Sequence, residues 1–149
     1  MIRPIGFADI LSAPNARELI AEYSAECSIA EIGPINPQKA IYAALEANRA
    51  MQCFGAFKDD TLTGFATVLV SVNPHYGRKL AVIESLFVTA ENRRSDAGTE
   101  LLAAVESYAR GTECAGILYS APAGGSLERL LQRRAQYTLT NTVFFRSLA

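Results

Sequence analysis

The chain has 149 residues, half of them hydrophobic, and 14 basic against 15 acidic residues give a formal net charge of −1. This length predicts a single domain over residues 1–149, and the charge balance argues against a dedicated nucleic-acid binder, which normally has a strongly basic face. The chain has one histidine and three cysteines without CxxC spacing. We therefore expect no bound metal.

The N-terminal sequence MIRPIGFADI lacks the apolar core of a signal peptide. No stretch approaches the roughly 20 apolar residues that a membrane-spanning helix needs. Three scattered thiols are typical of a reducing compartment. We therefore expect a cytoplasmic protein with neither a membrane nor a nucleic acid as partner.

Residues 2–7 predict a short first strand, which Pro4 limits to an edge or an end of a sheet. Apolar residues at helical spacing then predict a helix that begins after Asn15. A second helix is expected at about residues 37–48, where Asn-Pro has the form of a helix start.

Aromatic and β-branched residues mark three strands from residue 51 onward, in the runs MQCFGAFK, TGFATVLVSV and LAVIESLFVTA. Their short connections favour antiparallel neighbours. A helix is expected at 97–110, a strand at 115–120 that is parallel to 80–89, a short helix in SLERLLQRRA and a final strand in YTLTNTVFFRSL. The order β-α-α-β-β-β-α-β-α-β predicts an α/β (α+β) domain with a mixed, mostly antiparallel sheet of about six strands and about four helices.

The segment from Leu80 to Leu102 has the composition of an anion site. A strand ends in a turn with Arg93 and Arg94, and Gly98 then opens an amphipathic helix. The first amides of a helix have no partner within it and attract anions such as a pyrophosphate. The alternative is that Ser95 or Asp96 simply caps the helix and that the arginines are solvated.

In this segment and in its order of elements, the sequence resembles the GNAT superfamily of N-acetyltransferases over about residues 2–148. Leu86 and Val88 match the end of the family's strand, and the loop Arg93–Gly98 lies where the family binds phosphate, although Asp96 replaces a usual glycine. The resemblance implies acetyl-CoA as co-substrate and a primary amine as acceptor. The cofactor-binding residues that it implies are Leu86, Phe87, Val88, Arg93, Arg94, Ser95, Asp96, Ala97, Gly98 and Thr99.

The transfer needs a neutral amine, and Glu84, a carboxylate in the middle of an apolar strand, is the candidate base. Family members that use a glutamate often place it on this strand; the alternative is an outward, solvated side chain. The family's usual tyrosine acid aligns with Gln132, so Tyr119 is the first candidate substitute and Tyr108 the second, unless both only fill the core. An acetyltransferase and a catalytically degenerate binding or structural module of the same fold both remain open.

Three further features allow two interpretations each. Glu18, Glu22 and Glu26 share one stripe of the first helix, and together with Glu31 they form either an acidic rim for a cationic acceptor or a solvated face. Three arginines near the end of the last helix either contact the adenosine 3′-phosphate or stay exposed: Arg129, Arg133 and Arg134. The apolar TVFF of the final strand could contribute to a homodimer interface.

Overall fold

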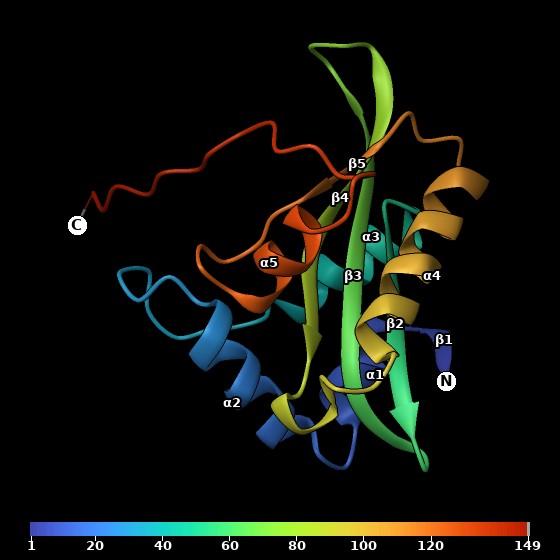
Figure 1. Ribbon diagram of the computed structural model, residues 1–149. Coiled ribbons are helices and arrows are strands. Elements are labelled where there is room, and N and C mark those ends of the chain that lie inside the picture. Colours follow the sequence, from blue (N-terminus) through green and yellow to red (C-terminus); the bar gives the residue numbers. More distant parts are fainter. Residues whose placement is uncertain (149) are drawn as a thin grey trace.

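The computed structural model describes residues 1–148, and these residues form one five-stranded sheet with five α-helices (Figure 1). The elements in chain order are β1 (Ile2–Ile5), α1 (Phe7–Ser12), α2 (Ala16–Cys27), α3 (Lys39–Ala47), β2 (Met51–Lys58), β3 (Thr61–Asn73), β4 (Arg78–Val88), the 3₁₀ turn η1 (Ala90–Asn92), α4 (Ala97–Gly111), β5 (Ile117–Tyr119) and α5 (Ser126–Gln132).

The sheet has the order β1-β2-β3-β4-β5, so strands that follow one another along the chain are neighbours in space. The first four strands pair antiparallel; for β2, β3 and β4 this confirms the prediction from their short connections, whereas β1 reaches β2 only after three helices. Asp59 and Asp60 join β2 to β3 with φ values of 46° and 61°, the left-handed conformation that a two-residue hairpin loop requires. β5 pairs parallel with β4 after the α4 crossover, which confirms the predicted β-α-β step.

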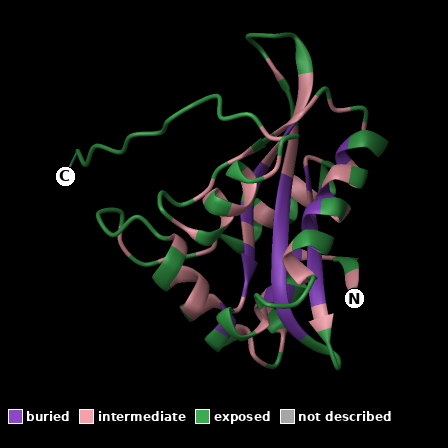
Figure 2. Ribbon diagram, in the orientation of Figure 1, coloured by how far each residue is buried: buried purple, intermediate pink, exposed green. Residues whose placement is uncertain are grey.

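Each face of the sheet has its own hydrophobic cluster. On one face α4 buries Leu101 and Val105 against strand residues such as Val68 and Ile83. The other face is covered by α1, α2 and α3, whose Phe7, Ile10 and Leu19 pack on Met51, Phe65 and Phe87. The central strands are therefore largely buried, whereas the outer helix surfaces are exposed (Figure 2).

Two expected strands differ from those observed, the helices of residues 1–148 number five because α1 was not expected, and α3 begins at Lys39 after Gln38 rather than at Pro37. The first strand ends at Ile5, because Asp9 accepts a hydrogen bond of 2.8 Å from the N–H of Gly6 and thereby starts α1. The final strand is wrong: the described residues of YTLTNTVFFRSL form no strand, so the sheet has five strands rather than six. This segment has the residue types of a strand but no neighbouring strand to pair with, and a strand exists only through its pairing.

Candidate active site

The strands β4 and β5 pair over only the first half of β4 and then separate. Their pairing ends at Ile83 and Tyr119, whereas β4 continues to Val88 with β3 on its other side. Within the described residues, the edge of β4 from residue 84 to residue 88 therefore has no strand beside it. Such an edge presents main-chain N–H and C=O groups to which an extended ligand can bind.

Glu84 lies where the two strands part, and it occupies a β-bulge. Ser85 is opposite Thr67 and Ile83 is opposite Val68, so Glu84 is an extra residue in β4. Bulges of this kind re-aim a side chain and are frequent beside active sites. The bulge directs Glu84 toward the face of the sheet that α1, α2 and α3 cover, where it contacts Tyr42 of α3.

Two hydroxyl groups hold the Glu84 carboxylate. The hydroxyl of Tyr42 donates to Oε1 at 2.8 Å, and that of Thr67 donates to Oε2. Thr67 is fully buried, and its Oγ1 lies 2.6 Å from Oγ of Ser85. Glu84 is exposed, yet residues from α3, β3 and β4 fix its orientation, which distinguishes it from a solvated side chain.

The phenols near Glu84 remain protonated at neutral pH. Burial raises the pKa of Tyr42 well above its usual range, and the hydrogen bond to Glu84 raises it further. Burial, followed by the charge of Glu84, raises the pKa of Tyr23 in the same way. The Tyr42 ring also stacks on Phe7, with ring centroids 3.5 Å apart, so its hydroxyl is held as a donor in a fixed position.

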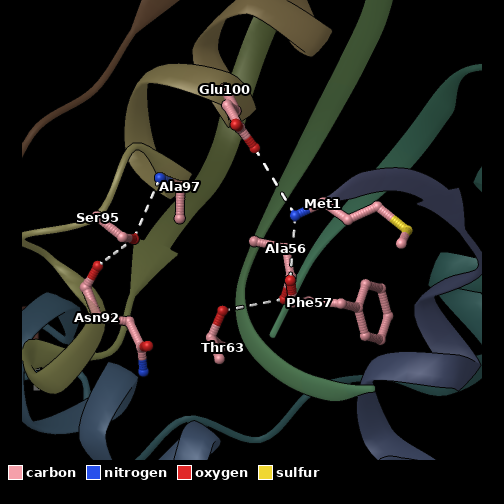
Figure 3. Close-up of polar contacts among 8 residues, drawn as sticks. All are labelled: Met1, Ala56, Phe57, Thr63, Asn92, Ser95, Ala97 and Glu100. Carbon is pink, nitrogen blue, oxygen red and sulfur yellow. Dashed lines mark hydrogen bonds and ion pairs between the residues drawn. The ribbon is translucent and has the colours of Figure 1, made fainter. Parts of the chain in front are cut away.

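The candidate anion loop follows the end of β4 directly. Oγ of Ser95 donates to the carbonyl of Asn92 at 2.6 Å and accepts from the N–H of Ala97 at 3.3 Å (Figure 3). The side chain of Asp96 makes no capping hydrogen bond, although this residue immediately precedes α4. In the described part of the chain, the N–H groups of Gly98 and Thr99 have no hydrogen-bond partner and are available to an anion.

Arg93 is occupied by protein contacts. Its Nε donates to the carbonyl of Val88 at 2.9 Å, and its Nη2 lies 2.6 Å from Oε2 of Glu26. Glu22 likewise accepts a hydrogen bond of 2.6 Å from the N–H of Ala90. Two members of the acidic stripe therefore hold α2 against the turn after β4.

Arg134 reaches the candidate anion loop, although it lies 35 residues further along the chain. Its Nη2 donates to Oγ1 of Thr99 at 2.9 Å, which places a guanidinium beside the first turn of α4. Arg94 is exposed in the loop itself. The positive charge at this end of α4 therefore comes from two different parts of the chain.

Tyr119 lies on the opposite face of the sheet from Glu84, packed against the α4 cluster. Its hydroxyl is buried and has no hydrogen-bond partner among the described residues. Burial raises the pKa of Tyr119 well above its usual range, so the phenol keeps its proton at neutral pH. Gln132 binds Glu128 within α5, at 3.0 Å, and takes no part in this arrangement.

Sequence reasoning missed Tyr42, Thr67 and Ser85. Tyr42 and Thr67 lie 42 and 17 residues from Glu84 along the chain, so no spacing in the sequence connects them with it.

Among residues 1–148, no group of three or more histidine, cysteine or acidic side chains is arranged to hold a metal ion. No helix in this part of the chain is long and apolar enough to cross a membrane.

Comparison with known proteins gives a family and a fold for the chain. The sequence model of the family described as "Acetyltransferase (GNAT) family" matches residues 13–130. No curated protein matches the chain. Solved structures do match: an aminoglycoside acetyltransferase from an uncultured soil metagenomic sample has a TM-score of 0.75 at 17% identity, covering 100% of this chain and 96% of that one.

Two further solved structures share the fold. A ribosomal-protein-alanine N-acetyltransferase from Brucella melitensis biovar Abortus 2308 has a TM-score of 0.69 at 17% identity, covering 99% of this chain and 98% of that one. The structure of AAC(6')-Iy in complex with a bisubstrate analogue that contains CoA has a TM-score of 0.68 at 15% identity, covering 100% of this chain and 97% of that one.

Proposed function

Because the chain belongs to the GNAT family of acetyltransferases, we propose that it transfers an acetyl group from acetyl-CoA to a primary amine by direct attack, with Glu84 as the base. The observation that carries this proposal is the carboxylate of Glu84, which Tyr42 and Thr67 hold at the point where β4 and β5 part. Three thiols without a disulfide, Cys27, Cys53 and Cys114, favour the reducing cytoplasm as its location.

The chain offers groups that fit the parts of acetyl-CoA. The edge of β4 at residues 86–88, which pairs with no strand, would bind the amide groups of the pantetheine arm through the main-chain groups that remain beside the carbonyl of Val88, which Arg93 occupies. The N–H groups of Gly98 and Thr99, within the loop of residues 93–99, would bind the pyrophosphate at the positive end of the α4 dipole. Arg134 adds a cation beside Thr99. The side chain of Asp96 is exposed and engaged in no cap, so it can turn away from a bound phosphate.

The site contains a group that could accept a proton during an acetyl transfer. An alkylamine with a pKa of about 10.4 is mostly protonated at neutral pH and must lose a proton before it attacks. The carboxylate of Glu84 would accept this proton, directly or through a water molecule. The nitrogen lone pair then forms the C–N bond while the C–S bond of the thioester breaks, and the nitrogen loses its second proton to water as the amide forms. The CoA thiolate leaves and takes a proton from water; Tyr119 is the candidate donor from the sequence, but its buried hydroxyl on the other face of the sheet would have to pass its proton through water.

The test compares Glu84→Gln with the control Glu113→Gln, which changes an exposed glutamate just beyond α4. Release of the CoA thiol is followed with a panel of amines that includes aminoglycosides and a peptide with an N-terminal alanine, the acceptors suggested by the similar structures. Removing a general base typically costs about 10²–10⁴-fold, so we expect kcat of Glu84→Gln to fall by that factor. Unchanged turnover from pH 6 to 9 would remove Glu84 from the mechanism.

A second measurement separates the enzyme from a degenerate binding module, an alternative suggested by Asp96 in the loop and Gln132 at the position of the usual tyrosine. Thermal unfolding is recorded with acetyl-CoA and with free CoA. A ligand that binds only the folded state at about 100 times its Kd adds roughly 2.7 kcal/mol of stability. Stabilisation without turnover of any amine supports the module, and no stabilisation contradicts the use of acetyl-CoA.

A further inference from the structure

The carboxylate of Glu84 stands at one end of a group of hydroxyl side chains on a single face of the sheet. Thr67 and Ser85 are opposite each other in the ladder of β3 and β4, and Phe65 and Phe87 form the next pair on the same face. Both phenylalanines pack on the face that α1, α2 and α3 cover. Residues two positions apart on a strand share a face, so Thr67 and Ser85 lie on this face as well.

Tyr23 of α2 lies over these two pairs. Its ring meets the rings of Phe65 and Phe87 edge-on, with centroids 5.3 and 5.6 Å away. Burial and the charge of Glu84 raise the pKa of Tyr23, and a hydrogen bond with Ser85 opposes this rise. The hydroxyl of Tyr23 is therefore a protonated neighbour of the hydroxyl of Ser85.

The charge of Glu84 fixes the direction of the hydrogen bonds among these groups. A carboxylate only accepts, so Thr67 gives its single hydroxyl hydrogen to Glu84. Oγ1 of Thr67 also lies 2.6 Å from Oγ of Ser85, and because Thr67 has no second hydrogen, Ser85 is the donor in this bond. The oxygen of Ser85 then accepts from Tyr23. Thr67 and Ser85 are both buried, so bulk water does not interrupt the chain of hydroxyls.

The chain of hydroxyls begins near the place where the proposed function puts the thioester. The proposed pyrophosphate site follows the end of β4, so the pantetheine arm would run from residue 88 toward residue 86, with its sulfur end directed at residues 84 and 85. The helix α2, which carries Tyr23, lies beside the end of β4, where Glu22 accepts from the N–H of Ala90 (Figure 1). Tyr119, by contrast, lies on the opposite face of the sheet.

We propose, building on the acetyl transfer proposed above, that Tyr23 protonates the departing CoA thiolate and that Ser85 and Thr67 return to it the proton that Glu84 took from the amine. While Glu84 is a carboxylate, the hydrogen of Tyr23 is engaged with Ser85. Once Glu84 is protonated it becomes a donor to Thr67, each bond of the chain reverses, and the hydrogen of Tyr23 is free to point at the sulfur.

The protons of this relay balance over one turnover. The thiolate forms an S–H bond with the hydrogen of Tyr23, and Tyr23 takes a proton from Ser85, Ser85 from Thr67, and Thr67 from the carboxyl group of Glu84. The phenol and the carboxylate are thereby restored. The proton that the CoA thiol gains is the first one that the ammonium group lost, so the relay takes the place of water as the donor to sulfur.

Release of the CoA thiol by Tyr23→Phe and Ser85→Ala tests the relay. A positioned proton donor typically contributes about 10²–10⁴-fold, so we expect the kcat of each variant to fall by at least about 10²-fold with acetyl-CoA. The double variant should be no slower than the slower single variant, because both residues serve one path. The control Tyr76→Phe changes an exposed tyrosine in the hairpin between β3 and β4 and should keep the wild-type kcat. Thermal unfolding checks that the variants fold, and Tyr23→Phe, which keeps the packed ring, decides alone if Ser85→Ala does not.

The leaving group gives a measurement that a purely structural role of Tyr23 would not change. The thiolate of p-nitrothiophenyl acetate is much less basic than that of CoA and leaves without a proton donor. With this acetyl donor, the loss in kcat/KM of Tyr23→Phe should be at least about tenfold smaller, whereas Glu84→Gln should stay slow because the amine must still lose its proton.

The outcomes separate the relay from the acetyl transfer on which it rests. Wild-type kcat in Tyr23→Phe, or an equal loss with both acetyl donors, overturns the relay and leaves the proposed acetyl transfer intact. A wild-type protein that acetylates none of the amines from acetyl-CoA contradicts the proposed function, and the relay falls with it.

Discussion

Gly64 of β3 leaves no room for a side chain beside the end of β4, and Gly64→Ala tests this close approach. Gly64 is opposite Val88 in the ladder. A Cβ at this position would lie 2.6 Å from the carbonyl oxygen of Phe87 and 3.1 Å from Cα of Val88. Carbon and oxygen ordinarily approach to about 3.3 Å, so the two strands would have to separate by about 0.7 Å.

The loss of folding free energy that this separation causes depends on the kind of atom that the new Cβ contacts. Backbone atoms of β4 cannot rotate away as a flexible side chain would, and overpacking of a dense interior typically costs about 1–3 kcal/mol. We expect Gly64→Ala to lower the free energy of unfolding by that amount. Because the atoms that move belong to Phe87 and Val88, which we propose to bind the pantetheine arm, we also expect the Kd for CoA to rise.

Urea unfolding measures the first effect and calorimetric titration with CoA the second. The control is Gly116→Ala, whose added Cβ would have its nearest neighbour, Cδ2 of Leu80, at 4.0 Å. It should stay within about 0.5 kcal/mol of the wild type. If Gly64→Ala proved as stable as Gly116→Ala and bound CoA normally, the close approach and the reasoning built on it would be refuted.

Three other predictions concern single contacts. Tyr42→Phe removes a hydrogen bond to the Glu84 carboxylate, typically worth about 1.5–3 kcal/mol. The kcat should therefore fall at least about tenfold, with little change in the KM for acetyl-CoA. An unchanged kcat would exclude Tyr42 as a positioning residue. Burial raises the pKa of the Cys53 thiol from 9.0 to about 12, so above about pH 9 the folded state keeps a proton that the unfolded chain loses. The free energy of unfolding should therefore decline above about pH 9, by at most about 1.4 kcal/mol per pH unit. Urea unfolding between pH 9 and 10 should show a shallower decline for Cys53→Ala than for the wild type. Arg134→Met should raise the Kd for CoA a few-fold at low salt, in line with about 1 kcal/mol for an exposed charge, whereas Arg133→Met should not; equal effects of the two variants would show that the contact of Arg134 is unimportant.

The sequence predicted best what depends on neighbouring residues. The helix expected at 97–110 is observed at Ala97–Gly111, because its start, its periodicity and its end are all local features. The parallel pairing of β4 with β5 followed from the length of the connection. The hydrogen bond from Tyr42 to Glu84 could not be foreseen, because it depends on the packing of α3 over the bulge.

Residues 138–148, the C-terminal arm, show where prediction from residue type alone fails. Its residues have strand propensity, and the prediction of a strand rested on that property alone. Propensity describes a chain that suits a pleated sheet, but the strand itself needs a neighbour with free hydrogen-bonding groups. Whether an edge is within reach depends on where Tyr137 fixes the start of the arm, which is a tertiary contact with Glu106 of α4.

The extra residue at Glu84 also sets the phase of β4. Before it, Ala81 and Ile83 face the α4 cluster, whereas after it Leu86 and Val88 do, so the inward positions change from odd to even numbers. Deleting Glu84 would restore a regular ladder in which Ala81, Ile83, Leu86 and Val88 still face the α4 cluster, so the core does not need the extra residue, whereas the position of the carboxylate between Tyr42 and Thr67 depends on it.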